Sequence, residues 1–484
     1  MICIPIVAKT NAEAFSLLAR AASEPADLYE LRFDLWREPP DIPGLIAAAT
    51  RRVIATCRSR GQGGEFDGTI AERAALLQQA IDAGAAYVDA EEDVAPLLRK
   101  SPSTILIASW HEFNGMPDDL RTVSERLAAT QCDWVKFAVA PSRLSDNFIV
   151  LDAIRASRKP AIGIAMGEFG LASRILGIAH GSQLTFGTLS SGMESAPGQP
   201  TARELAEIYR VNQLTRETAV YGLVGDPVRH SSGLRFHNRA FQALGIDAVY
   251  IPFLCRDLGD FLADAAEAIT LRGLSVTMPL KHAALGLAND ASAVAARAGA
   301  ANTLVYRGNG WFAENTDYAA VASAVREKAR EKDIALAGAP ALLIGAGGAG
   351  RAIGAALASL GCTVTVAARN MDKARSLADA MGWDAQPPAA VSHSSWRVVA
   401  NSTPIGMAPN TNETPFPAEA WRAGMIAFDA VYNPKKTRFL AEAERAGAVI
   451  IDGVDMFIRQ GIAQFLLWTG KTMPRELQSI PGAK

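Results

Sequence analysis

The most constraining feature of the sequence is a regular alternation of short apolar runs with helical patterns over its first 210 residues. Repeated strand–helix units build parallel sheets, and eight of them within about 200 residues favour a closed (β/α)8 barrel. We expect a plausible helix after each strand, and a site where the strands' carboxyl ends meet. The predicted strands are residues 2–8, 27–34, 53–58, 87–91, 104–111, 134–138, 161–166 and 184–186.

The remaining sequence predicts further domains of the α/β class. Residues 210–218 are polar and precede a new strand at 219–225, so the barrel is expected to span residues 1–212. Strand and helix patterns then continue to about Asp317, a helix follows, and another strand opens at Ala341 into a glycine cluster. We expect a substrate-binding domain at 219–320, a Rossmann-like domain at 321–450, and a C-terminal helix at 451–484 that packs back on the substrate domain.

Composition excludes several classes of function. The 48 basic and 50 acidic residues nearly balance, and no stretch gathers the basic excess that nucleic acid or an anionic membrane requires. The five cysteines form no CxxC pair, so we expect neither a disulfide framework nor a metal site, and a reducing cytoplasm fits. The first residues lack the pattern of a signal peptide, and the uncharged stretches around Arg351 are rich in Gly and Ala, as in a protein core.

Charged side chains punctuate the predicted barrel strands. In YELRFDLW the alternation of a strand places Glu30, Arg32 and Asp34 on one face, which a barrel directs into its lumen. This face is either an interior ion-pair network or part of a site, and the segment alone favours neither. The next strand delivers Arg58 and a glycine-rich turn that bears Gln62 and Glu65; an arginine there can bind a carboxylate with two hydrogen bonds.

Two further strands carry His111 (ILIASWHEF) and Lys136 (DWVKFAVA). Burial lowers the pKa of a lysine amine, as a Schiff-base nucleophile requires. Taken singly, Lys136 is more often a strand-end residue with its amine in water, and His111 a core residue. Their place on neighbouring strands at one barrel end favours a shared catalytic site.

The motifs ELR, RS..GG, WHEF, VKFAVAP and SAPGQ, with the arginine after Ala165-Met166, resemble type I 3-dehydroquinate dehydratase over residues 1–210. The resemblance implies that Lys136 forms an iminium with the ring ketone and that His111 moves the α-proton. It implies a lid at SAPGQ, Arg174 on the substrate carboxylate, and a site lined by Glu30, Arg32, Arg58, Met166, Arg174, Ser195 and Gln199. Many members of the family have a glutamate where this chain has Gln62, so charge tuning of His111 from that position is not expected.

A strand, a glycine-rich turn and a helix are predicted from LLIGAGGAGRAIGAAL, which would bring backbone N–H groups close to phosphate oxygens. The following strand ends in Arg369, where an NAD enzyme usually has an acid for the ribose, and an arginine suits a 2′-phosphate. The alternative is that Arg369 is a surface arginine that follows a strand and does not bind a 2′-phosphate. Upstream, Lys281 and Asp317 could share a proton near a carbonyl, or form a structural salt bridge.

The motifs YGLVGDPVRHS, SVTMPLK, GAANTL, NTD, IGAGGAGR, NSTPIGM, FDAVYNP and DGVDMFIRQ resemble shikimate dehydrogenase across residues 219–470. The resemblance implies Lys281 and Asp317 as the catalytic pair. It implies a substrate site of Ser231, Thr277, Asn302, Asp317, Tyr432 and Gln460, and an NADP site of Gly345, Gly347, Gly348, Ala349, Arg369, Thr403 and Gly453. The family usually reads HSxS where this chain reads HSSGL; in an extended segment Ser232 could not replace the serine missing at Gly233.

The order of the two resemblances matches bifunctional enzymes, in which the first product, 3-dehydroshikimate, is the second substrate. The sequence therefore predicts a cytoplasmic enzyme that converts 3-dehydroquinate through 3-dehydroshikimate to shikimate with NADPH. One alternative is a metabolite-sensing regulator on the same folds, which the retention of Lys136, His111, Lys281 and Asp317 disfavours. Another is an NAD-linked quinate/shikimate dehydrogenase, which Arg369 disfavours. The oligomeric state stays open.

Overall fold

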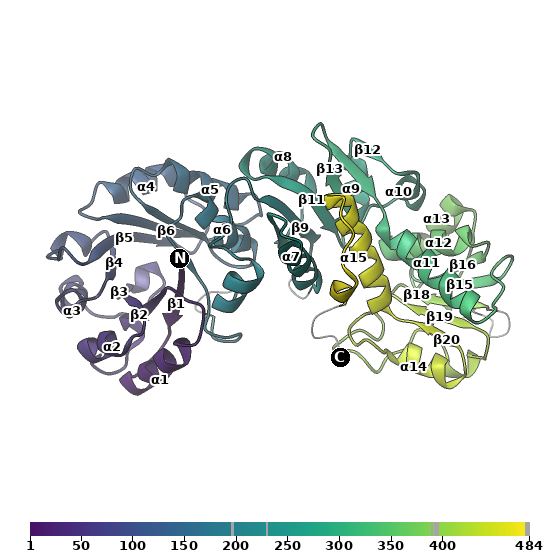
Figure 1. The fold of residues 1–484 in the computed structure, drawn as a ribbon, viewed down its shortest axis with the longest axis horizontal. Coiled ribbons are helices and arrows are strands. Elements are labelled where there is room, and N and C mark those ends of the chain that lie inside the picture. Colours follow the sequence, from purple (N-terminus) through teal and green to yellow (C-terminus); the bar gives the residue numbers. More distant parts are fainter. Residues whose placement is uncertain (195–197, 229–230, 389–390, 392–395, 480–484) are drawn as a thin grey trace. The chain divides into compact units, whose positions relative to one another are not determined.

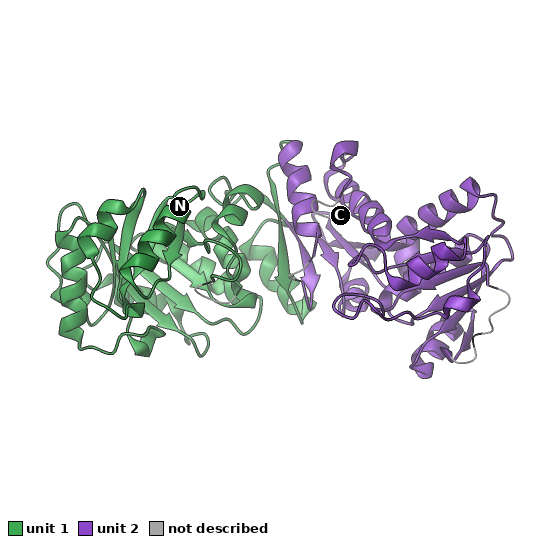
Figure 2. Cartoon of the chain, turned by 90° about the horizontal axis from the view of Figure 1, so that it is seen from below, with its two compact units in different colours: residues 1–220, 245–271 green, residues 221–244, 272–484 purple. Residues whose placement is uncertain are grey.

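A computed structural model describes residues 1–194, 198–228, 231–388, 391 and 396–479. The chain forms two compact units, one of residues 1–220 with 245–271 and one of residues 221–244 with 272–484 (Figure 2). Among the described residues, no helix is both long and apolar enough to cross a membrane. Each unit is described by itself below.

The first unit contains eight parallel strands in the order β7-β6-β5-β4-β3-β2-β1-β8. Strands β1 to β6 are labelled in Figure 1. Just before β8, the backbone N–H of Gln183 donates to the carbonyl oxygen of Ala161 at 2.9 Å, which links the two ends of the sheet. The predicted barrel is therefore confirmed. Its strands are β1 (Ile2–Ile6), β2 (Leu28–Arg32), β3 (Arg52–Thr56), β4 (Tyr87–Glu91), β5 (Ile105–Glu112), β6 (Trp134–Val139), β7 (Ala161–Ala165) and β8 (Thr185–Phe186).

Helices follow most of these strands. They are α1 (Asn11–Ala21), α2 (Ile42–Ala48), α3 (Ile70–Asp82), α4 (Leu120–Ala128), α5 (Asp146–Ala156) and α6 (Leu171–Leu176). The expectation of a helix after every strand is wrong between β4 and β5, where only the 3-10 turn Ala95–Leu97 forms; its central Pro96 has no N–H for a helical hydrogen bond. A short π-helix, Glu204–Ile208, follows β8, and the unit also holds β10 (Ala248–Leu254) and α8 (Leu258–Ala268).

The second unit contains a mixed sheet in which β9, β11, β13, β14 and β12 lie side by side in that order. Strand β13 is antiparallel to both β11 and β14, whereas β12 and β14 are parallel. The strands are β9 (Ala219–Gly225), β11 (Leu271–Val276), β12 (Asp290–Ala291), β13 (Thr303–Tyr306) and β14 (Trp311–Glu314). The helices connected to this sheet are α7 (Gly233–Ala243), α9 (Lys281–Leu287), α10 (Ala293–Ala298) and α11 (Thr316–Glu331).

A second sheet in this unit is parallel, with the strand order β17-β16-β15-β18-β19-β20. The order reverses between β15 and β18, and open α/β sheets bind ligands at the carboxyl ends of the strands beside such a reversal. This is the predicted Rossmann-like fold. Its elements are β15 (Pro340–Ile344), α12 (Gly348–Ser359), β16 (Thr363–Ala367), α13 (Met371–Met381), β17 (Asp384–Gln386), β18 (Val398–Asn401), β19 (Ile426–Asp429), α14 (Arg438–Arg445) and β20 (Val449–Ile451).

The last helix, α15 (Gly453–Thr469), packs against the mixed sheet. The buried Gln464 amide accepts a hydrogen bond from Ser275 at 2.7 Å and donates to the Asn302 carbonyl at 3.1 Å. Trp468 donates its indole N–H to the Leu304 carbonyl at 3.1 Å. Because these polar partners are buried, the helix has one preferred position on strands β11 and β13.

Candidate active sites

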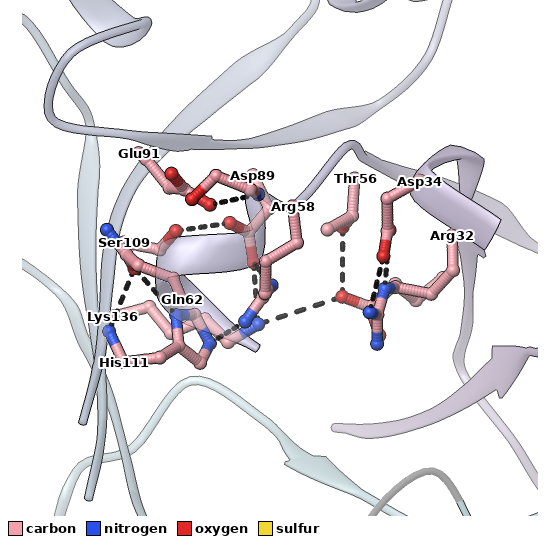
Figure 3. A network of polar contacts seen from close by, with 12 residues as sticks. Arg32, Asp34, Thr56, Arg58, Gln62, Asp89, Glu91, Ser109, His111 and Lys136 are labelled. Carbon is pink, nitrogen blue, oxygen red and sulfur yellow. Dashed lines mark hydrogen bonds and ion pairs between the residues drawn. The ribbon is translucent and has the colours of Figure 1, made fainter. Parts of the chain in front are cut away.

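A buried lysine lies at the centre of the barrel. Lys136 on β6 donates a hydrogen bond from Nζ to Oδ2 of Asp89 at 2.6 Å, and Oε1 of Glu30 lies 3.7 Å from the same nitrogen. The amine also lies 4.6 Å from the ring centroid of Phe186 on β8. Side chains from three different strands, β2, β4 and β8, thus surround the amine. Figure 3 shows Lys136 and Asp89 within the polar network of this site.

His111, on the neighbouring strand β5, has its ring held on both sides. Oε1 of Gln62 lies 3.2 Å from Nδ1 and accepts the backbone N–H of His111 at 2.9 Å, while Arg58 contacts Nε2. Burial, together with the charges of Arg58, Lys136 and Arg32, lowers the pKa of His111 well below its usual value. The imidazole is therefore neutral at neutral pH and can accept a proton.

Asp89 on β4 is a member of this site that the sequence analysis missed. Its carboxylate accepts hydrogen bonds from Lys136, from Arg58 at 3.2 Å and from Ser109. Burial opposes ionisation, but Lys136 and Arg58 outweigh it and lower the pKa of Asp89 to about 2. Strand alternation could have revealed it, because Asp89 and Glu91 share one face of a predicted strand.

The barrel site opens into a cavity of about 310 Å³, which most of the predicted site residues line. Arg174 on α6 is buried, and its Nε has no hydrogen-bond partner among the described residues; burial lowers its pKa to about 10. A buried guanidinium in this state fits an anionic group of a ligand. Ser195 lies outside the described residues, and the predicted site residues that share this cavity are Glu30, Arg32, Arg58, His111, Lys136, Met166, Arg174 and Gln199.

The second unit also holds a lysine against an aspartate. Lys281, the first residue of α9, donates from Nζ to Oδ2 of Asp317 at 2.6 Å. Asp317 lies in the first turn of α11, where the helix dipole favours a negative charge. The lysine side chain is 17% exposed and the aspartate 6%, so solvent reaches the lysine more readily.

Asn302 holds the start of α11 in place beside this pair. Its Oδ1 accepts the backbone N–H of Thr316 at 2.8 Å, and its Nδ2 donates to the Thr316 hydroxyl at 2.9 Å. Oε1 of Gln460, on α15, lies 3.5 Å from the same Nδ2. The structure thus gathers Lys281, Asp317, Asn302 and Gln460.

The other predicted substrate residues lie on separate elements. Thr277 follows β11, Tyr432 follows β19 and contacts the Phe457 ring, and Ser231 accepts the Gly233 N–H at 3.2 Å. The expectation that HSSGL is extended is wrong at Ser232, whose φ of −67° and ψ of −13° are helical because α7 begins at Gly233. The argument from strand alternation therefore does not apply to this serine.

The glycine-rich turn after β15 is shaped to approach a phosphate closely. Gly345 has a φ of +111°, and a Cβ there would lie 2.4 Å from the Ser402 hydroxyl, so glycine is required. Gly347 caps α12 without a side-chain hydrogen bond and faces open space. Gly348 and Ala349 begin the helix, and a Cβ on Gly348 would lie 3.5 Å from Lys281. The turn fits the pyrophosphate of a dinucleotide beside this lysine.

Three further residues predicted to contact the cofactor follow elements of the same sheet. Arg369 is exposed after β16, the neighbour of β15, and Thr403 follows β18 with both its N–H and its hydroxyl donated to Asn401. Gly453 begins α15, where a Cβ would lie 2.4 Å from the Val431 carbonyl oxygen. This close approach to backbone gives Gly453 a packing reason of its own.

Comparison with known proteins gives family matches along most of the chain. Residues 2–216 match the type I 3-dehydroquinase family and residues 223–304 the shikimate dehydrogenase substrate binding domain. Residues 327–392 match the shikimate/quinate 5-dehydrogenase family, and residues 453–477 the shikimate 5′-dehydrogenase C-terminal domain. The chloroplastic bifunctional 3-dehydroquinate dehydratase/shikimate dehydrogenase of Arabidopsis thaliana is 34% identical, over 99% of this chain and 83% of that protein.

The chain belongs to the bifunctional 3-dehydroquinate dehydratase/shikimate dehydrogenase family. Shikimate biosynthesis protein AroDE of Chlamydia pneumoniae is 30% identical over 77% of this chain and 75% of that protein. A crystal structure of a shikimate dehydrogenase in complex with NADP+ is 30% identical, with a TM-score of 0.50, and covers 55% of this chain and 94% of that one. This bifunctional enzyme thus carries two activities of the shikimate pathway, 3-dehydroquinate dehydratase and shikimate dehydrogenase, on one polypeptide.

Proposed function

We propose that Lys136 is the amine that condenses with the ketone of 3-dehydroquinate. The lysine loses a proton, its nitrogen attacks the ketone carbon, and water leaves to give an iminium that retains one N–H. The observation that carries the proposal is the buried Nζ beside Asp89, with His111 on the next strand. Water is largely kept from the amine, which protects an iminium from premature hydrolysis.

His111 is the proposed base and acid of the elimination. Its Nε2 accepts the proton from the carbon beside the iminium, and the electron pair forms an enamine. When the enamine returns to an iminium, the hydroxyl on the β-carbon leaves and takes the proton from His111, so it departs as water. Hydrolysis of the iminium then releases 3-dehydroshikimate and regenerates Lys136.

The substrate is held by charged and polar groups around the cavity. Arg174 is the proposed partner of the substrate carboxylate, since its buried Nε has no partner among the described residues. Hydroxyl groups on the ring would be bound by carboxylate, guanidinium and amide side chains. The complete proposed set is Glu30, Arg32, Arg58, Met166, Arg174, Ser195 and Gln199.

NADP is the cofactor of the dehydrogenase, and its reduced form, NADPH, would supply the hydride that reduces 3-dehydroshikimate to shikimate, leaving NADP+. Lys281 and Asp317 are proposed to deliver a proton to the alkoxide oxygen, because the two share a hydrogen bond of 2.6 Å. Ser231, Thr277, Asn302, Tyr432 and Gln460 are proposed to hold the substrate. The proposed NADP residues are Gly345, Gly347, Gly348, Ala349, Arg369, Thr403 and Gly453, with Arg369 on the 2′-phosphate.

We further propose four domains: the dehydratase at 1–212, the substrate-binding domain at 219–320, the NADP domain at 321–450 and the C-terminal segment at 451–484. The family matches at 2–216, 223–304, 327–392 and 453–477 support this order. The five cysteines are all free, which suits the cytoplasmic location that we propose.

Borohydride trapping tests the assignment of Lys136. Reduction in the presence of 3-dehydroquinate should fix the ligand's mass on the peptide that contains Lys136, and Lys136→Ala should remove the label. Lys159 serves as a matched control, because Lys159→Ala should leave the label in place. A label on any other lysine would contradict the assignment.

A further inference from the structure

Asp89 is the nearest anion to the reacting nitrogen of the dehydratase. Its Oδ2 lies 2.6 Å from Nζ of Lys136, and the Asp89 side chain is only 2% exposed (Figure 3). Arg58 at 3.2 Å and Ser109 donate to the same carboxylate. These partners fix both oxygens of Asp89, so the carboxylate cannot turn away from the lysine without breaking buried hydrogen bonds.

Glu30 is a weaker candidate for the same position. Its Oε1 lies 3.7 Å from Nζ of Lys136, which is beyond hydrogen-bond distance. The same oxygen already accepts the hydroxyl of Thr56 at 2.9 Å. Asp89 therefore has the stronger direct interaction with the amine.

The charge on the lysine nitrogen changes several times during the reaction proposed above. It is positive in the ammonium, neutral in the attacking amine, positive in the iminium, and neutral again in the enamine. A fixed anion within hydrogen-bond distance lowers the energy of each positive state relative to the neutral states. The iminium N–H replaces the ammonium N–H as the donor, so one carboxylate can bind both.

We propose that Asp89 is the counterion of the reacting nitrogen, and accepts a hydrogen bond first from the Lys136 ammonium and then from the iminium N–H. The proposal rests on the role assigned above to Lys136. It makes Asp89 a catalytic residue, because Asp89 touches the nitrogen at which the covalent bond forms. Stabilisation of the iminium by Asp89 assists the elimination, while the same interaction makes the free amine harder to form.

Asp89 is one of several titratable or charged groups around the Lys136 amine. The others that face Lys136 or share its cavity come from strands β1, β2 and β5, from helix α6 and from loops. They are Cys3, Glu30, Arg32, Arg58, Glu65, His111, Arg174 and Glu194. Since a substitution at Asp89 leaves these eight groups in place, any change it causes belongs to this one carboxylate.

The test is Asp89→Asn, which keeps the size of the side chain and removes its charge. The dehydratase kcat should fall about 10- to 100-fold, as expected for loss of a charged hydrogen bond of about 1.5–3 kcal/mol. The pH above which borohydride traps the 3-dehydroquinate adduct should move down by about one unit, because the amine loses its proton more easily. A purely structural role would lower activity without this shift.

Glu91→Gln is the matched control. Glu91 is a second buried carboxylate on the same face of β4, but it binds Arg73 at 2.6 Å and the Ser59 N–H at 2.7 Å. Its neutralisation should leave the pH of trapping unchanged. An equal shift in both variants would show that the effect comes from a general change of charge, and would contradict the proposal.

Two outcomes separate the possible failures. If Lys136 carries the label but Asp89→Asn keeps the wild-type kcat and trapping pH, the counterion proposal is wrong and the role of Lys136 stands. If the label lies elsewhere, the role of Lys136 fails first. If Asp89→Asn does not fold, the counterion proposal is tested instead with a crystal structure of the wild-type enzyme after borohydride reduction with 3-dehydroquinate. A distance of about 3 Å between Asp89 and the linked nitrogen supports the proposal, and one above about 4 Å contradicts it.

Discussion

The two halves of the chain each place a lysine against an aspartate at the same distance, 2.6 Å, yet the surroundings of the two pairs differ. In the barrel, Lys136 and Asp89 are 5% and 2% exposed, with a histidine and an arginine beside them. In the dehydrogenase half, Lys281 and Asp317 are 17% and 6% exposed, next to a glycine-rich turn.

The comparison shows that a Lys–Asp pair does not determine the chemistry. A dry site with a neutral imidazole nearby suits a covalent iminium and proton abstraction from carbon. A more open pair at the start of a helix, beside a nucleotide-binding turn, suits transfer of one proton to an alkoxide. The groups around the pair therefore distinguish the two active sites.

The largest expected effect comes from Asp317→Asn, which removes one member of the dehydrogenase pair. We expect a fall in the kcat for 3-dehydroshikimate reduction of about 10²- to 10⁴-fold, with unchanged dehydratase kinetics. Glu314→Gln, whose carboxylate binds Ser292 at 2.6 Å, is the control and should lose far less. A comparable loss of dehydratase activity in Asp317→Asn would contradict the independence of the two pairs.

Arg369→Ala tests the proposed NADP contact made by this residue, which follows β16 on the nucleotide-binding side of the dehydrogenase site. The KM for NADPH should rise about 10- to 100-fold through loss of a charged hydrogen bond to the 2′-phosphate, while the KM for NADH changes little. Arg375→Ala, at an exposed position on α13, is the control in the same region. Steady-state kinetics with both cofactors provide the measurement, and equal losses would exclude the proposed contact.

Gln62→Glu tests whether a negative charge near His111 changes the chemistry of the barrel site. A carboxylate beside Nδ1 should raise the histidine pKa, increase the dehydratase rate several-fold, and move the acidic limb of its pH profile upward. The rate is measured from the absorbance of 3-dehydroshikimate. If the rate and profile stay unchanged while Glu65→Gln slows the enzyme, Glu65 already supplies that charge.

The smallest effect concerns Asp429, a fully buried carboxylate with neutral donors, Asn401, Thr437 and the Val431 N–H. Burial raises its pKa from 3.8 to about 6, in contrast to Asp89. The folded state therefore binds this proton more tightly than the unfolded state does, and protonation of Asp429 stabilises the fold. This contribution to the free energy of unfolding is complete below about pH 4 and is lost as the pH rises through about 6.

Asp429→Asn should remove the loss of stability that wild type shows as the pH rises through the pKa of Asp429. Relative to wild type, its free energy of unfolding in urea should improve by about 1 kcal/mol between pH 5 and pH 7, with little change in activity. Asp384→Asn, at an exposed position in the same sheet, should show no such trend. If the difference in unfolding free energy between Asp429→Asn and wild type does not change with pH, Asp429 stays ionised without a cation and the prediction is wrong.

Local sequence patterns predicted much of this organisation. Strand periodicity places β4 at residues 87–91 and Lys136 within β6, and the glycine cluster places the turn before α12. The prediction of a helix after β4 failed. The sequence there is compatible with a helix, but Pro96 cannot donate a helical hydrogen bond, and only a 3-10 turn forms. Likewise, HSSGL contains no local signal strong enough to show that α7 begins at Gly233.

Asp89 shows why the rest of the site could not be predicted in this way. Its partner Lys136 is 47 residues away along the chain, and Arg58 is 31 residues away. Strand alternation indicates that Asp89 shares a face with Glu91, but not which of the two reaches the lysine. That choice depends on the register between strands, which tertiary packing sets.

The most direct test of two separate Lys–Asp sites is a single reaction with 3-dehydroquinate and NADPH, followed by NMR of the products. Wild-type enzyme should form shikimate, Lys136→Ala should leave 3-dehydroquinate unconverted, and Lys281→Ala should accumulate 3-dehydroshikimate. A mixture of the two variants should again form shikimate. Shikimate from Lys136→Ala alone, or unconverted 3-dehydroquinate with Lys281→Ala, would contradict the account.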